Sequence, residues 1–391
     1  MTGVRTRRQV LTGAQLALLV AGFFVNIGTF AVYPYLAVLL RERLDVGIGT
    51  VGVVLGAATL VQFASAPVTA ALAERVGLKR ALLLATVLYG LGAVAYLLGW
   101  PYGPGLTVLG LFLSCGAGAV YSPAYRGYLA QSAAEEHRPL VVSASNSASN
   151  LGVALGPVVG AFFLADPGRL FAVNAVLYAV LVVAHTFLRP EHPAEEPAAV
   201  EPFRRVLHGL AGLPFVLTAL THYLYWQFYQ YLSVYADGRI ATTLYGVLMM
   251  GYSLGLVVVQ PLVSGWVGRI RYPVAMAAGF AAMGAGMVAI AAGGPVTIAV
   301  GVAAMSLSTA VLFLKNDLEA LARSRRSATV TFGQQRLATG IGAFLSGVVG
   351  GNVYALFEHG DLVPGFWLVV AAQAVLLALV AAVRVRASRT P

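Results

Sequence analysis

A histidine and three aromatic residues share one helical face in the second half of the chain. The spacing i, i+3, i+4 and i+7 joins His222, Tyr225, Trp226 and Tyr229. An imidazole exchanges protons near neutral pH, and aromatic rings bind planar or cationic amphiphiles by stacking and cation–π attraction. The pattern therefore predicts a wall that binds both protons and substrate. The alternative is a structural histidine bonded to a carbonyl, among rings that pack on lipid or on another helix.

A second polar face occurs in the first apolar segment, where Asn26, Thr29 and Tyr33 recur at i, i+3 and i+7. Polar side chains on one face of an otherwise apolar helix favour contact with a cavity. We expect these three to bind substrate together with Tyr121 and Tyr125 of the fourth segment. The alternative is a set of hydrogen bonds between helices, each contributing about 0.6 kcal/mol in a membrane.

Charged residues are almost absent from the apolar segments, so those that touch them are functional candidates. Asp317 and Glu319 lie about 30 Å along the tenth segment, near its end. Together with His222 and Arg336 they are the candidates for proton coupling.

Arg126 has a depth in the fourth segment comparable to that of Asp317 in the tenth. We expect two latches at the inner gate, closed when the cavity faces outward: Arg126 with Glu74, and Asp317 or Glu319 with Arg269 or Arg271. The alternative is a set of ordinary interfacial charges that extend to water.

The elements that would position these residues are twelve apolar segments. Residues are 59% hydrophobic and only 10% charged, against about 25% charged in a soluble domain. A helix needs about 20 apolar residues to span the hydrocarbon core. We predict an all-α integral membrane protein with spans at 11–40, 50–73, 80–99, 106–130, 140–164, 168–188, 209–236, 242–267, 273–292, 296–317, 328–357 and 364–384.

The longest polar gap divides the spans into two sets of six. It predicts an N-terminal six-helix bundle at 1–188, a cytoplasmic linker at 189–208 and a C-terminal six-helix bundle at 209–391. The segments GVALGPVVGAFF (152–163) and GAFLSGVVGGNV (342–353) align between the two sets. Such a repeat is typical of secondary transporters, whose substrate site lies between the halves.

Charge and composition exclude several other classes of protein. Most Lys and Arg residues lie in the gaps on the side of both chain ends, which predicts cytoplasmic termini in a cell membrane and explains the net charge of +10. We expect no nucleic-acid partner. The single cysteine, Cys115, excludes a disulfide framework, and we expect no metal site and no cofactor. No phosphate-binding loop or HExxH motif suggests an enzyme.

Two motifs carry a resemblance to a known family. AALAERVGLKR (70–80) resembles the loop signature of the major facilitator superfamily, which implies a gating role for its members Glu74, Arg75, Gly77, Lys79 and Arg80. Ala70 replaces the leading glycine. The fifth span carries G-x-x-x-G-P-x-x-G, which resembles the antiporter signature of the drug:proton exporters in that superfamily and would act in helix packing through Gly152, Gly156, Pro157 and Gly160.

The resemblance covers the whole chain and implies twelve helices in two pseudo-symmetric bundles. It also implies that helices one, four, seven and ten surround the cavity. The chain departs from those exporters in two ways: the fourth span lacks their usual arginine, and no carboxylate lies at mid-membrane. We expect a monomer that exports small amphiphilic drugs or metabolites in exchange for protons. The alternative is an uptake symporter or a uniporter for a small polar nutrient.

Overall fold

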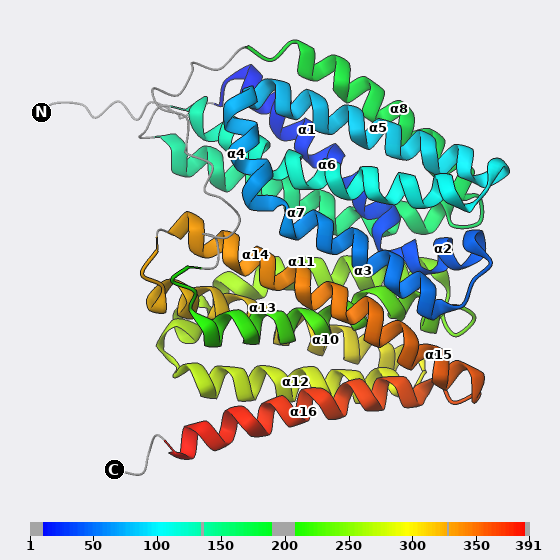
Figure 1. Cartoon of the computed structure of the whole chain (residues 1–391), viewed down its shortest axis with the longest axis vertical. Coiled ribbons are helices and arrows are strands. Elements are labelled where there is room, and N and C mark those ends of the chain that lie inside the picture. Colours follow the sequence, from blue (N-terminus) through cyan, green and yellow to red (C-terminus); the bar gives the residue numbers. More distant parts are fainter. Residues whose placement is uncertain (1–10, 134–136, 190–207, 327, 388–391) are drawn as a thin grey trace, which may run out of the picture.

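The protein, seen in a computed structural model, is all-helical over its described residues, 11–133, 137–189, 208–326 and 328–387. Its helical segments form twelve rods that run across the molecule (Figure 1). The first six are α1–η1–α2 (Gly13–Val32, Tyr33–Tyr35, Leu36–Leu44), α3–α4 (Ile48–Ala64, Ala66–Val76), α5 (Leu78–Tyr102), α6 (Pro104–Gln131), α7 (Arg138–Phe163) and α8 (Pro167–Thr186). The last six are α10 (Gly212–Ala236), α11 (Thr242–Arg269), α12 (Tyr272–Ala291), α13 (Pro295–Arg323), α14–η3–α15 (Ala328–Leu345, Ser346–Gly350, Gly351–His359) and α16 (Pro364–Ala387).

The helix boundaries follow local sequence signals. Thr12 caps α1 in a capping box with Gln15, and proline occupies the first position of α6, α8, α13 and α16. Nine of the described helical runs are long and apolar enough to cross a membrane. Of the other rods, α3 has only 17 residues before a break at Ser65, and α7 and α10 carry many polar side chains. The expected all-helical membrane architecture is confirmed.

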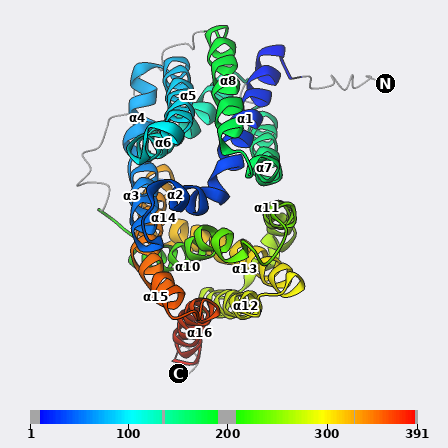
Figure 2. The ribbon, with the colours of Figure 1, turned by 90° about the vertical axis from the view of Figure 1, so that its right-hand side faces the viewer.

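The rods pack as two groups placed side by side (Figure 2). We call α1–α8 the first helix group and α10–α16 the second. Between them, α7 packs on α11, and α3 packs on α14, η3 and α15. The expected linker, 189–208, lies outside the described residues except for its two ends.

The aligned glycine segments make equivalent contacts in the two groups. In the first, Gly152 lies against the Phe23 carbonyl of α1, and in the second, Gly342 lies against the Ala219 carbonyl of α10. Along α7, Gly156 and Gly160 also face α1, whereas the Pro157 carbonyl accepts a hydrogen bond from Tyr35 at 2.6 Å. The small residues of the fifth-span motif thus lie where two helix backbones come closest.

One close approach between the groups is a crossing of glycines. Gly347, in the π-helical turn η3, lies against Gly52 and Gly56 of α3. A side chain added at Gly347 would meet the backbone of α3, which cannot move aside as a flexible side chain would.

We predict that Gly347→Val lowers the thermal stability of the purified protein by an amount equivalent to about 1–3 kcal/mol, because the new side chain overpacks this crossing. Gly251→Val is the matched control, since Gly251 is helical and exposed with open space where its Cβ would be. Thermal unfolding in detergent measures both. Equal melting temperatures for the two variants would contradict the prediction.

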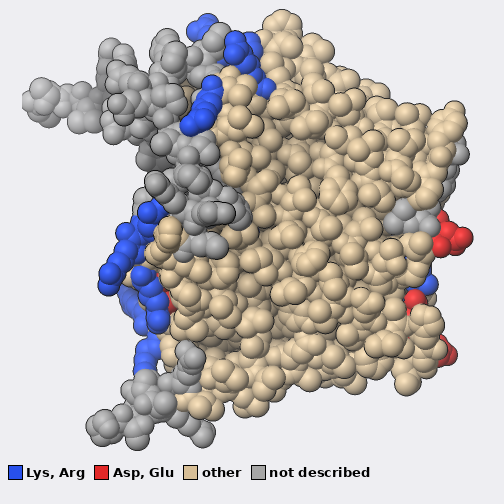
Figure 3. Space-filling view, in the orientation of Figure 1, with Lys and Arg blue, Asp and Glu red and all other residues tan. Residues whose placement is uncertain are grey.

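Charged residues gather on two opposite faces of the molecule (Figure 3). On the face where α1 begins and α16 ends, hereafter the basic face, lie Arg75, Lys79, Arg80, Arg269, Arg271, Arg323, Arg325 and Arg326. On the other, hereafter the opposite face, lie the acids Glu42, Asp45, Asp166, Asp237, Glu358 and Asp361. The band between them is almost free of charge, as a membrane-embedded surface requires.

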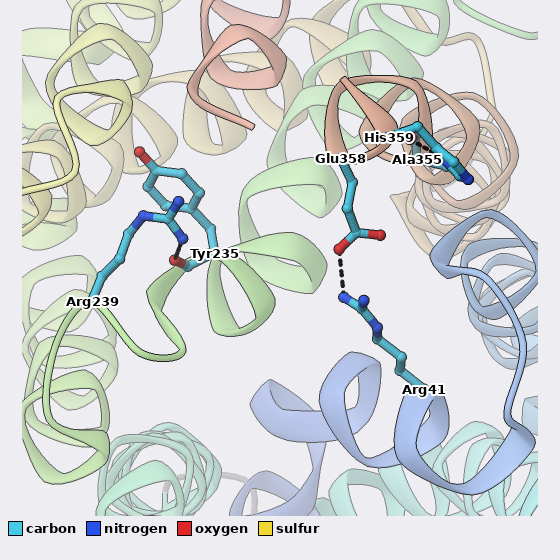
Figure 4. A network of polar contacts seen from close by, with 6 residues as sticks. All are labelled: Arg41, Tyr235, Arg239, Ala355, Glu358 and His359. Carbon is cyan, nitrogen blue, oxygen red and sulfur yellow. Dashed lines mark hydrogen bonds and ion pairs between the residues drawn. The ribbon is translucent and has the colours of Figure 1, made fainter. Parts of the chain in front are cut away.

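The two groups are joined at the opposite face. Arg41 of α2 donates to Glu358 of α15 at 2.6 Å, and Tyr245 of α11 donates to the Pro34 carbonyl of η1 at 3.2 Å (Figure 4 shows the first of these). Near the Arg41–Glu358 pair, Arg239 donates to the Tyr235 carbonyl within the second group. Toward the basic face, α6 and α13 make no comparably extensive contact in the described residues.

We predict that Arg41→Glu loosens this closure and that adding Glu358→Arg restores it. The effect of the single change should be about 0.2–1 kcal/mol, since the pair is partly exposed. Spin labels at positions 42 and 362, in a Cys115→Ala background, would report the distance across the opposite face. If the spin-label distance in the double variant is no closer to the parent's than that in the single variant, Arg41 and Glu358 do not act as a direct pair.

Candidate functional site

A small chamber of about 30 Å³, with room for about two water molecules, lies inside the first helix group. Residues of α1, η1, α2, α5, α6 and α8 line it, and Gln62 of α3 completes the lining. None of the described residues that line it is charged. The chamber can therefore offer hydrogen bonds and ring faces, but no ion pair.

Polar side chains of the lining bond mostly to one another. Tyr33 donates to the Gln62 side-chain oxygen at 3.1 Å, and the hydroxyls of Thr29 and Tyr178 are 3.3 Å apart. Asn174 donates to the Gly28 carbonyl at 3.0 Å. The amide nitrogen of Gln62 has no hydrogen-bond partner within the described part of the chain, so it can donate to a ligand.

Two stacked ring pairs form the chamber's apolar walls. Tyr89 stacks on Tyr178 with ring centroids 5.1 Å apart, and Tyr96 stacks on Phe171 at 4.9 Å. Sequence reasoning missed these residues, although a signal existed. Helical spacing places Tyr89 and Tyr96 seven apart on α5, and Phe171, Asn174 and Tyr178 at i, i+3 and i+7 on α8.

The structure separates the residues that were expected to bind substrate. Thr29 and Tyr33 line the chamber, but the Asn26 side chain donates to the Gly22 carbonyl of its own helix. Tyr121 and Tyr125 stack on each other inside the first group and do not line the chamber. Asn26 is placed instead at the close contact between α1 and α7.

The aromatic face of α10 meets the first group at Tyr33. The Tyr33 ring lies 5.8 Å from Trp226 and 6.2 Å from Tyr229, measured between centroids. Phe63 of α3 lies 6.2 Å from Trp226 on the same side. Tyr33 thus contacts both the chamber and the second helix group.

His222 is partly buried among side chains of the second group. Its Nδ1 donates to the Thr218 carbonyl at 2.9 Å, its Nε2 lies 3.3 Å from the Thr339 hydroxyl, and its ring stacks on Phe313 at 4.6 Å. The Thr339 hydroxyl also donates to the Gln335 carbonyl. A hydroxyl can donate a hydrogen bond or accept one. The Thr339 hydroxyl can therefore donate to Nε2 of a neutral His222 or accept from Nε2 of a protonated one.

Tyr225, the remaining member of the expected aromatic wall, turns toward α11 and α13. Its ring lies 5.4 Å from Phe313 and 6.2 Å from Tyr252. The wall is therefore divided between a junction with the first group and a ring cluster inside the second.

Three charged residues lie near one another where the helix groups face each other toward the basic face. Arg126 of α6 and Asp317 of α13 both act electrostatically on Arg336 of α14. Both arginine side chains are exposed, and the Arg336 guanidinium lies 5.6 Å from the Phe63 ring. Glu319 pairs with Arg323 at 2.7 Å rather than with Arg269 or Arg271.

The remaining gating candidates lie at the basic face. Gly77 has a φ of 98°, which favours glycine, and Lys79 donates to the Thr186 carbonyl of α8 at 2.8 Å. Arg75, Arg80, Arg269 and Arg271 are exposed there. The side chain of Glu74 lies outside the described residues, so its expected pairing with Arg126 stays a prediction.

Comparison with known proteins decides the family. The sequence profile of the Major Facilitator Superfamily matches residues 18–315. The chain belongs to the major facilitator superfamily. It is a multi-pass membrane protein of that superfamily.

Individual relatives match only part of the chain. An uncharacterized MFS-type transporter of Mycobacterium tuberculosis (strain ATCC 25618 / H37Rv) is 32% identical over 179 residues, which are 46% of this chain and 42% of the relative. A Na(+), Li(+), K(+)/H(+) antiporter of Planococcus maritimus is 30% identical over 146 residues, 37% of this chain and 34% of that protein. The matched region thus spans less than half of each relative.

Solved structures match the fold over nearly the full length. The nucleoside transporter NupG superposes with a TM-score of 0.78 at 13% identity, covering 95% of this chain and 99% of that one. A POT family transporter in complex with 5-aminolevulinic acid gives 0.74 at 13% identity, with 94% and 95% covered. At such identities the likeness concerns the major facilitator fold alone.

Cys115, the one cysteine of the chain, lines the chamber and reports on access to it. We predict that Tyr33→Ala speeds alkylation of Cys115 by N-ethylmaleimide several-fold, because Tyr33 stands between the chamber and the junction of the groups. Tyr102→Ala is the control, since Tyr102 is 77% exposed at the end of α5. Mass spectrometry of timed samples gives both rates, and a rate unchanged in Tyr33→Ala would contradict this position.

Proposed function

We propose that this transporter exports small amphiphilic compounds in exchange for protons, as the drug:proton antiporters do. The observation that carries the proposal is the position of Tyr33, which contacts an uncharged chamber on one side and the aromatic face of α10 on the other. Uncharged hydroxyls and ring faces suit compounds that are partly apolar. The glycine and proline motif of α7, which resembles an antiporter signature, favours export.

We further propose that the basic face is cytoplasmic, which puts both termini inside the cell. With the groups joined at the opposite face, the conformation would then face inward. Transport would proceed by rocking of the six-helix groups, residues 1–188 and 209–391, around the junction at Tyr33. Closing the basic face would bring Arg126 of α6 toward Asp317 of α13, and their opposite charges would stabilise the outward-facing state.

Proton coupling is assigned to His222 and Asp317. His222 has a hydrogen-bonded arrangement for both of its protonation states, through Thr218, Thr339 and Gln335. Asp317 is half-buried beside Arg336, and the charge of Arg336 also acts on His222. The charge of Arg336 thus acts on both His222 and Asp317. Binding of a proton by either side chain changes the net charge around Arg336.

The test is uptake of a planar amphiphilic dye into proteoliposomes driven by an imposed pH gradient. We expect His222→Gln or Asp317→Asn to abolish the response to the gradient while dye exchange without a gradient continues. Asp361→Asn is the control: Asp361 lies on the opposite face with a φ of 54°, a conformation that asparagine adopts readily.

Retention of gradient-driven uptake in both variants would overturn the assignment of the proton sites. A wild-type protein that carries dye only in the same direction as protons would favour the symport alternative. Reversing the direction of the imposed pH gradient distinguishes antiport from symport, because the dye moves against the protons in the first case and with them in the second.

A second candidate is exchange of monovalent cations for protons, suggested by the relative from Planococcus maritimus. Against it, no carboxylate lines the chamber among the described residues, and no cluster of three or more His, Cys, Asp or Glu residues there could hold a metal ion. Adding Na⁺, Li⁺ or K⁺ to the same proteoliposomes under a pH gradient tests it. Proton release on addition of any of these salts, absent from protein-free liposomes, would favour this candidate.

A further inference from the structure

We infer that Trp226 selects among transported compounds by donating its indole N–H to an acceptor oxygen, such as a carbonyl on a planar ring. The inference rests on the proposed function, since it names a chemical requirement on the substrate of that transporter. It places the contact between the two helix groups, where Trp226 of α10 meets Tyr33 and Phe63 of the first group.

The position of Trp226 between the groups is the first step. Its ring centroid lies 5.8 Å from that of Tyr33 in η1 and 6.2 Å from that of Phe63 in α3, and only 5% of the residue is exposed. Tyr225 and Tyr229 of its own helix pack against the same ring. When the groups rock, Tyr33 and Phe63 would move relative to Trp226, so the surroundings of this residue would change during the transport cycle.

The second step is the unused hydrogen-bonding capacity of Trp226. Its indole nitrogen is buried and has no hydrogen-bond partner within the described part of the chain. A buried indole N–H usually finds an acceptor, because leaving the donor unpaired costs free energy. An oxygen of the substrate would supply that acceptor. A compound of the same shape without the oxygen would leave the N–H unpaired and would bind less tightly.

The third step is the route to this donor. Arg126 and Arg336 are exposed where the groups face each other toward the basic face, and the Arg336 guanidinium lies 5.6 Å from the Phe63 ring. Phe63 is half-buried, so it lies between the exposed Arg336 and the buried Trp226. A planar compound that enters from this side would stack on Phe63 first. It would reach the indole N–H once the Phe63 ring moves aside.

Trp367 of α16 provides a comparison within the same chain. Its indole nitrogen is also buried and unpaired among the described residues. Its ring packs on Tyr235 and Phe366, which both belong to the second helix group. A ligand between the groups would not reach this N–H. The two tryptophans therefore separate the effect of a contact with ligand from the effect of removing any buried indole.

The experiment compares fluorenone with fluorene, two planar compounds with the same carbon skeleton, of which fluorenone carries a carbonyl where fluorene has a CH₂ group. Each compound is used to displace the planar dye of the transport assay from purified protein in detergent, without a pH gradient. The ratio of the two displacement constants is the preference for the carbonyl. Comparing this ratio between variants cancels the unequal partition of the two compounds into detergent.

We expect the preference for fluorenone to fall about 3- to 10-fold in Trp226→Phe, which keeps an aromatic ring, because one neutral hydrogen bond represents a factor of this size. Trp367→Phe is the matched control and should keep the wild-type preference. An unchanged preference in Trp226→Phe, an equal fall in Trp367→Phe, or displacement of the dye by neither compound would overturn the inference.

A measurement on the wild-type protein covers the case in which Trp226→Phe does not fold. The chain has four tryptophans, so ¹⁵N-labelled tryptophan gives four indole N–H signals. The signal of Trp226 is assigned by elimination from Trp100→Phe, Trp266→Phe and Trp367→Phe. We expect fluorenone to shift the Trp226 proton downfield, as a new hydrogen bond does, and fluorene not to do so. The same response to both compounds would contradict the contact.

The outcomes distinguish this inference from the proposed function. A preference for fluorenone that depends on Trp226, in a protein without gradient-driven dye transport, would refute the proposed function and leave the contact. Gradient-driven dye transport in a protein whose preference does not depend on Trp226 would refute the contact and leave the proposed function.

Discussion

The ring of Tyr33 is shared between two environments, and in the proposed mechanism the coupling of substrate binding to helix movement depends on it. Its hydroxyl is held by Gln62 of α3, whereas its face contacts Trp226 and Tyr229 of α10. Pro34 makes this position possible, because the α-helix gives way there to the short 3-10 turn η1. The turn directs Tyr33 between the groups while α2 continues toward the Arg41–Glu358 contact.

Around that junction, the packing is closest where side chains are absent. Glycines bring α7 onto α1 within the first group, α14 onto α10 within the second, and η3 onto α3 between the groups. Only the η3–α3 contact would move when the groups rock, and its small residues let the two backbones lie close together. Charged residues lie on the two faces and in the cluster of Arg126, Asp317 and Arg336. Closing of the basic face would bring the members of this cluster closer together.

The sequence predicted the spans well because membrane thickness sets their length, and a run of apolar residues records that length directly. Helical periodicity also identified the faces that carry Thr29 and Tyr33. It could not show that Asn26, on nearly the same face, bonds to its own helix, since this depends on how closely α7 approaches. The partners of His222 were equally hidden, because Thr339 lies 117 residues away along the chain. Tyr89, Tyr96 and Tyr178 have the spacing of a helical face, but only the fold shows that their faces meet.

The most direct test of the central claim, that Tyr33 couples the chamber to the second helix group, is a distance measured across the basic face. Spin labels at positions 131 and 321, on α6 and α13 in a Cys115→Ala background, would report opening and closing there. We expect two distance populations in the wild-type protein, whose ratio shifts with pH and with the planar amphiphilic dye of the transport assay, and loss of the dye-dependent shift in Tyr33→Leu. A dye-dependent shift that survives in Tyr33→Leu, or a single distance under all conditions, would contradict the claim.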